Sequence, residues 1–137
     1  LAGGSAGGQL AASIANIFHR KNKNLPKPIA LILYNPAINI PPKGKIKDDY
    51  FRDYFKDPAK GPLINFPPCI IMHGTNDKVV PFNWISDFVD NLKTKSIDCV
   101  FKIYHGKKHG FFNKNICNKD YLKTNKQIDA FLNSRGI

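Results

Sequence analysis

The sequence lacks several features that would place the protein outside the ordinary globular class. Its longest apolar run, residues 29–34, is far shorter than the ~20 residues that a membrane-spanning helix needs, so we expect no membrane span. Its three cysteines are an odd number, which excludes a complete set of internal disulfides. Arginine is also scarce, because only Arg20, Arg52 and Arg135 occur among the 21 cationic side chains.

The positive charge is the one feature of the composition that suggests a nucleic-acid partner. Lys and Arg number 21 against 10 Asp and Glu, a net charge of +11 at pH 7, and clustered cations bind phosphate by releasing counterions. However, most of these cations are lysines spread along the chain, whereas base and phosphate recognition favours the arginine fork. We therefore interpret the charge as a solvated surface and expect no nucleic-acid partner; a functional basic patch is the alternative.

What is present is an alternation of strand and helix patterns in 137 residues, of which 42% are apolar. Apolar runs predict buried strands, while apolar residues at a 3.6-residue spacing predict amphipathic helices. Such alternation is typical of βαβ crossovers and a parallel sheet in a single domain. Residues 36–68 are irregular and rich in proline, with one short helix predicted near 48–55. The predicted strands are 29–34, 69–72 and 98–104, and the later helices are 82–92 and 119–134.

The predicted helices have apolar faces that should pack on the sheet. The expected inward residues are Leu10, Ala11, Ile14, Ile17 and Phe18 in the first helix, Ile85, Phe88, Val89 and Leu92 in the second, and Leu122, Ile128, Phe131 and Leu132 in the last.

A glycine-rich bend joins the end of a strand to the first helix. Residues 3–7 match the pattern G-x-S-x-G with Ser5 at its centre, and small neighbours let the backbone turn tightly so that a nucleophilic hydroxyl is exposed. The N–H of Ala6, at the start of the helix, would then point toward an oxyanion on the substrate. A phosphate-binding P-loop would need Lys and Ser or Thr after Gly8, where Gln9 and Leu10 stand. A plain glycine-rich turn is the alternative.

Two later loops carry candidate partners for this serine. Asp77 lies just past the strand at 69–72, where a carboxylate can accept from a histidine ring and fix its tautomer; turn formation or helix capping is the alternative. His109 follows the last strand, and a merely solvated loop histidine is the alternative there. His73 is expected to support the loop that contains Asp77. His105 and His109 are four residues apart, but the segment lacks the Glu of H-E-x-x-H, so we expect no metal.

The three candidate residues share one predicted location. Ser5, Asp77 and His109 each follow a different strand, at the carboxyl edge where open α/β sheets bind ligands. Their order along the chain, Ser then Asp then His, is the order found in α/β-hydrolases. We therefore predict that the three side chains converge.

Four segments together resemble one family. LAGGSAGGQLAA is similar to the nucleophile elbow of the acetyl esterase/lipase, hormone-sensitive-lipase-like group of α/β-hydrolases, and LILYNPAIN to its next strand. FPPCIIMHGTNDKVVPF resembles its acid-bearing segment and YHGKKHGFFN its histidine loop. The resemblance implies an α/β fold class, the C-terminal part of an α/β-hydrolase with about three parallel strands and flanking helices. It also implies Ser5 as nucleophile, Asp77 as acid, His109 as base and Ala6 as an oxyanion donor, with no cofactor and no metal.

The resemblance also indicates an incomplete domain. The HGGG-type loop that supplies the other oxyanion donors in this group does not occur in the sequence, and Gly4 replaces the acidic residue frequent before the serine. We expect residues 1–137 to be a single partial α/β-hydrolase domain whose partner is the missing N-terminal half; the whole is called the parent protein below. Because losing one oxyanion donor costs about 10²–10³ in kcat, we expect this polypeptide alone to be inactive or nearly so.

The expected reaction of the parent protein is hydrolysis of a small-molecule carboxylic ester with a short acyl group, such as acetyl, through an acyl-enzyme. In that reaction Ser5 attacks the carbonyl, His109 takes its proton and Asp77 stabilises the imidazolium. The nearest rival is a serine peptidase of the prolyl-oligopeptidase type, and a non-catalytic half-domain is a rival of another class.

Aromatic residues of the irregular segment are candidate walls of the substrate pocket, because small-molecule sites are usually lined by apolar side chains. The alternative is that these aromatics only pin the segment to the core. They are Tyr50, Phe51, Tyr54, Phe55 and Phe66.

Overall fold

The computed structural model of the chain describes residues 1–21, 27–39 and 58–137. The described part contains one parallel sheet of four strands in the order β1-β2-β3-β4. About three strands were expected; the fourth is β1, the end of the strand that leads into Ser5. The strands are β1 (Ala2–Gly4), β2 (Leu31–Tyr34), β3 (Cys69–Gly74) and β4 (Cys99–Tyr104). The helices are α1 (Ala6–Lys21), α3 (Phe82–Thr94) and α4 (Asn118–Asn133), with a 3-10 turn, η1 (Pro58–Lys60).

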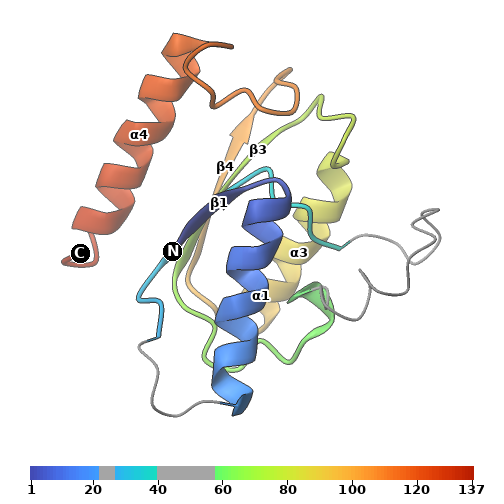
Figure 1. Cartoon of the computed structure of the whole chain (residues 1–137), viewed down its shortest axis with the longest axis vertical. Coiled ribbons are helices and arrows are strands. Elements are labelled where there is room, and N and C mark those ends of the chain that lie inside the picture. Colours follow the sequence, from blue (N-terminus) through green and yellow to red (C-terminus); the bar gives the residue numbers. More distant parts are fainter. Residues whose placement is uncertain (22–26, 40–57) are drawn as a thin grey trace.

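The helices cover both faces of the sheet, with α1 and α3 on one face and α4 on the other (Figure 1). Leu33 and Ile71 belong to the core cluster beneath α1 and α3, whereas Ile70 and Met72 pack in the cluster that includes Phe131 of α4. All six residues of β3 are buried, which is why its first four residues, Cys69 to Met72, are apolar without alternation. The structure confirms the α/β class and the parallel sheet.

The buried face of α1 differs from the face that the apolar spacing predicts. Ala11, Ala12 and Ala15 are buried, whereas Leu10 and Ile14 are 42% and 38% exposed. Small side chains let the helix axis approach β1 and β2 closely, so the alanine face packs inward and the larger residues turn outward. Of the predicted inward residues whose side chains the structure describes, only Ala11 is confirmed as buried. The side chains of residues 17 and 18 are not among those described.

The other two helices follow the prediction more closely. All four expected residues of α3 are buried. In α4, Phe131 is buried and Ile128 and Leu132 pack against it, but Leu122 is 50% exposed and Thr124 is buried instead. Thr124 is tolerated there because its hydroxyl donates to the carbonyl of Tyr121 at 2.7 Å. The helix predicted near 48–55 lies outside the described residues.

The described part of the chain contains no helix that is long and apolar enough to cross a bilayer. The three cysteines are free thiols. Cys69 and Cys99 stand opposite each other on β3 and β4 but are not joined by a disulfide.

Candidate active site

Ser5 stands on a sharp turn between β1 and α1. Its φ angle is +54°, in the left-handed region that residues with a side chain adopt only at a cost. Its backbone N–H donates to Tyr34 O at 2.9 Å, and its carbonyl accepts from the N–H groups of Ala37 (3.0 Å) and Gln9 (3.1 Å). These three bonds fix the backbone of Ser5 against β2 and α1 and so hold the side chain at the carboxyl edge of the sheet.

Two glycines of the turn have close neighbours on the side where a Cβ would stand. A Cβ on Gly3 would collide with the carbonyl of Gly7 in the first turn of α1. A Cβ on Gly4 would lie 2.9 Å from Cζ of Phe112, whose ring stacks on Tyr34 with centroids 4.5 Å apart. The Phe112 ring therefore occupies the space into which a side chain at position 4 would project, and it would have to shift to admit one.

Asp77 is buried in the loop after β3, and backbone groups orient its carboxylate. Oδ1 accepts from the N–H groups of Val79 and Val80, both at 2.9 Å. The residue before α3 is Pro81, which makes no side-chain cap, so Asp77 does not cap that helix. Because Oδ1 is occupied by the two amides, Oδ2 is free to accept from a histidine.

The ring of His109 lies between Asp77 and Ser5. Its Nδ1 is 2.7 Å from Oδ2 of Asp77, and its Nε2 is 3.0 Å from Oγ of Ser5. A carboxylate only accepts, so Nδ1 carries the proton, and Nε2 then accepts from the serine hydroxyl. The Asp77 side chain is fully buried while that of His109 is 24% exposed, so the acid lies inside and the ring faces the solvent side. The structure thus brings the three predicted residues together.

The loop that carries His109 is attached to the Asp77 loop and to α4. The N–H of Gly106 donates to Oγ1 of Thr75 at 2.8 Å, and the N–H of Asn76 donates to Lys107 O at 3.0 Å. Nζ of Lys107 lies 2.6 Å from Asp120 in the first turn of α4. This hydrogen bond raises the pKa of Lys107. Burial would raise the pKa of Asp120, but hydrogen bonds from Lys107 and from the Cys117 side chain outweigh it and lower that pKa.

His73 supports the Asp77 loop, as the sequence indicates. The residue is fully buried, and its Nε2–H donates to the carbonyl of Val80 at 2.9 Å. The same nitrogen is 3.7 Å from Oδ2 of Asp77. Burial lowers the pKa of His73 despite this carboxylate, so the ring is neutral near pH 7 and acts as a hydrogen-bond donor.

Asn35 is a residue of the site that the sequence analysis missed. It directly follows β2, is fully buried, and its Nδ2 lies 3.1 Å from each ring nitrogen of His109. Its position immediately after a buried strand is the same signal that Asp77 and His109 carry. The signal was hidden because Asn before Pro is also common in turns.

Ala6 occupies the first position of α1, directly after Ser5. The N–H groups of the first helical turn have no intrahelical acceptor, so the N–H of Ala6 is available at this edge of the sheet. Within residues 1–21, 27–39 and 58–137, no group of three or more His, Cys, Asp or Glu side chains is arranged to hold a metal ion.

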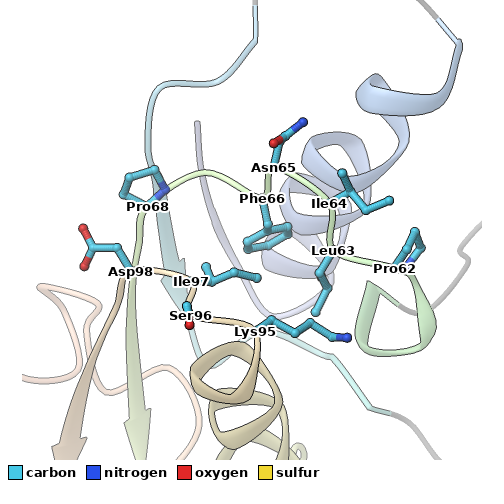
Figure 2. A pocket seen from close by; sticks show the side chains of 10 residues that line it. All are labelled: Pro62, Leu63, Ile64, Asn65, Phe66, Pro68, Lys95, Ser96, Ile97 and Asp98. Carbon is cyan, nitrogen blue, oxygen red and sulfur yellow. The ribbon is translucent and has the colours of Figure 1, made fainter.

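The structure places Phe66 away from Ser5. Its ring is buried and packs edge-on against Phe88, with centroids 6.3 Å apart. It also lines a pocket of about 480 Å³ together with Pro68, just before β3, and Asp98, just before β4 (Figure 2). That pocket is at the amino ends of the strands, opposite the edge that holds Ser5. Phe66 is therefore a core residue and not a wall at the Ser5 edge, while the other four candidate aromatics, at 50, 51, 54 and 55, lie outside the described residues.

A parallel sheet with Ser, Asp and His after its first, third and fourth strands is the arrangement of the α/β-hydrolase class. The sequence profile of the prolyl oligopeptidase family, Peptidase_S9, matches residues 42–134. The chain therefore belongs to the prolyl oligopeptidase family, a family of serine hydrolases within the α/β-hydrolase superfamily. The matched region contains Asp77 and His109 and begins after Ser5.

The chain is also similar to solved esterase structures. Thermogutta terrifontis esterase 2 phosphonylated by cyclosarin is 31% identical, with a TM-score of 0.84, over 98% of this chain and 53% of that one. The same esterase phosphorylated by paraoxon is 30% identical with a TM-score of 0.82 over 98% and 53%, and its propionate-bound form is 30% identical with a TM-score of 0.77 over 98% and 55%. The chain thus spans about half the length of these esterases. A search of curated proteins gives no significant match.

Proposed function

We propose that this chain supplies the nucleophile, the base and the acid of a serine hydrolase that cleaves carboxylic esters with short acyl groups. Ser5 attacks the ester carbonyl and His109 accepts its proton at Nε2. Asp77, held by two backbone amides, stabilises the imidazolium. The alcohol leaves with the proton from His109, and water then releases the acid from the acyl-serine.

The observation that carries the proposal is the position of the His109 ring, which contacts Asp77 Oδ2 at 2.7 Å and Ser5 Oγ at 3.0 Å at the same time. General-base catalysis requires the base to be within hydrogen-bond reach of the proton that it removes. The N–H of Ala6 at the start of α1 supports the proposal as one donor to the developing oxyanion.

A serine peptidase of the prolyl-oligopeptidase type is the second candidate, because the family profile over residues 42–134 is that of this family. Ester hydrolysis is preferred because the similarity to esterase 2 extends over 98% of the chain, including the serine turn. Both candidates use the same three side chains and differ in the acyl and leaving groups that the site accepts.

The experiment compares two substrates with the parent protein. We expect hydrolysis of p-nitrophenyl acetate and no release of nitroaniline from a Pro-linked anilide. Ser5→Ala should abolish the ester activity. Ser96→Ala is the matched control, because Ser96 is also a left-handed serine, with φ of +55°, and is exposed at the other edge of the sheet. Cleavage of the anilide alone would instead establish the peptidase.

Covalent labelling tests the nucleophile without turnover. A fluorophosphonate probe should phosphonylate the parent protein once, with loss of fluoride, and peptide mass spectrometry should locate the adduct at Ser5. The label should disappear in Ser5→Ala and persist in Ser96→Ala. An adduct on another residue, or unchanged labelling of Ser5→Ala, would contradict the assignment of Ser5.

A further inference from the structure

The amide of Asn35 cannot form an ordinary hydrogen bond to His109. Its Nδ2 is equidistant, at 3.1 Å, from Nδ1 and Nε2, while the in-plane directions of those nitrogens are taken by Asp77 and Ser5. An in-plane atom equidistant from both nitrogens would collide with the carbon between them. The amide therefore lies against the face of the ring, a contact of the N–H···π kind.

The backbone of β2 and β3 holds Asn35 under the ring. Its N–H donates to Met72 O at 2.8 Å, and its φ of +32° lies outside the range in which asparagine rests without strain. The side chain is fully buried. Asn35 is thus fixed to the two strands that lie between those carrying Ser5 and His109.

The retention of a polar side chain at this position needs an explanation. Oδ1 of Asn35 is buried and has no hydrogen-bond partner within the described residues, and such a group costs about 1–3 kcal/mol. A leucine of similar size would avoid that cost. Buried unsatisfied polar groups in native structures call for a specific reason, and here the amide contacts the ring of the proposed base.

We propose that Asn35 is a positioning residue that supports the face of the His109 ring and holds its two nitrogens in line with Asp77 and Ser5. This inference rests on the proposed function, in which His109 is the base. When His109 takes the serine proton, both ring nitrogens must stay aligned, Nδ1 with Asp77 and Nε2 with Ser5. Asn35 keeps that alignment by limiting how far the ring can tilt.

The deciding variant is Asn35→Asp in the parent protein, because it keeps the shape and replaces the amide by a carboxylate against the ring. An opposite charge within 4–6 Å favours the protonated ring, so we expect the midpoint of the acid limb of kcat/KM to rise by roughly 1–3 pH units. Asn91→Asp is the matched control: it adds the same charge on α3, where the Asn91 side chain donates to the carbonyl of Ala59, and should leave the midpoint unchanged.

A second variant and a second measurement separate the possible failures. Asn35→Leu should lower kcat by about 10-fold or more with little change in KM, as expected for a misplaced base. NMR titration of ¹⁵N-histidine, with the His109 signal assigned by its loss in His109→Gln, should show the same rise of midpoint in Asn35→Asp. If the wild type hydrolyses neither substrate, the proposed function fails, and the NMR titration still tests Asn35. An unchanged His109 midpoint in Asn35→Asp overturns the inference.

Discussion

At Ser5 the backbone is held in a conformation that costs of order 1–3 kcal/mol for a residue with a side chain. The bonds to Tyr34, Ala37 and Gln9 offset this cost, so the strain is maintained by the neighbouring strand and helix rather than by the turn itself. A turn supported in this way fixes the position of the serine hydroxyl relative to His109.

Gly3 is the residue of the turn that should tolerate substitution least. We predict that Gly3→Ala destabilises the parent protein by several kcal/mol or prevents folding, because the new methyl group would meet the backbone carbonyl of Gly7. Gly7→Ala is the matched control: a Cβ there meets nothing within 4 Å, and alanine in a helix is favoured over glycine by up to about 1 kcal/mol. Urea unfolding measures both, and a Gly3→Ala variant as stable as Gly7→Ala would contradict the contact.

His73 should make stability depend on pH. Burial lowers its pKa in the folded state, so between the folded and unfolded values the unfolded chain binds more protons. The stability that this histidine contributes is therefore fully present above its ordinary value of about 6.5 and is lost as the pH falls below it, by at most about 1.4 kcal/mol per pH unit. We predict that His73→Gln flattens the pH dependence of urea unfolding between pH 7 and 5. An equally steep decline in the variant would exclude His73 as its source.

The site residues that the sequence predicted are those that lie just after the end of a strand. Ser5, Asp77 and His109 follow three strands, and parallel strands end at one edge, so their convergence followed from the order of elements. Asn35 also follows a strand, but it was missed because an asparagine before a proline is equally common in turns. Phe66 was misplaced although it lies three residues before the strand predicted at 69–72, because the start of a parallel strand lies at the edge opposite Ser5 and this was not applied to it.

At the scale of elements, α1 shows how close packing overrides an apolar pattern. The spacing of Leu10 and Ile14 predicts a buried stripe, but the alanines beside it are buried instead. The helix must begin directly at Ser5 and therefore lies against β1 and β2, where only small side chains fit. The buried face of a helix was predicted correctly where large apolar residues form the contact, as in α3. It was predicted poorly where alanines form the contact, as in α1.

This packing predicts opposite outcomes for two substitutions in α1. Ala12 is completely buried, so Ala12→Leu should overpack the contact and lower the free energy of unfolding by roughly 1–3 kcal/mol. Leu10→Ala changes an exposed side chain of the same helix and should alter stability by no more than about 0.5 kcal/mol. Thermal or urea unfolding of the two variants provides the measurement. Equal destabilisation by both would mean that the face with Leu10 is covered in the parent protein.

At the scale of the whole molecule, the carboxyl ends of the strands carry all three candidate groups. The amino ends, at the opposite edge of the sheet, carry the pocket of Figure 2. Within the described residues β1 pairs only with β2, so its other side presents free backbone groups. A sheet edge of this kind is a site for pairing with another strand. The similar esterases are about twice as long as the chain.

The last prediction concerns residues 1–137 expressed alone. The site holds the proposed nucleophile, base and acid, but Ala6 is its only proposed oxyanion donor, and the sequence contains no HGGG-type loop. Since each missing donor costs about 10²–10³ in kcat, we expect p-nitrophenyl acetate hydrolysis to be at least ~10²-fold slower than in the parent protein. The rates are compared per folded molecule, with Ser5→Ala as the background. Robust turnover by the chain alone that is lost in Ser5→Ala would show that the oxyanion site is already complete within these residues.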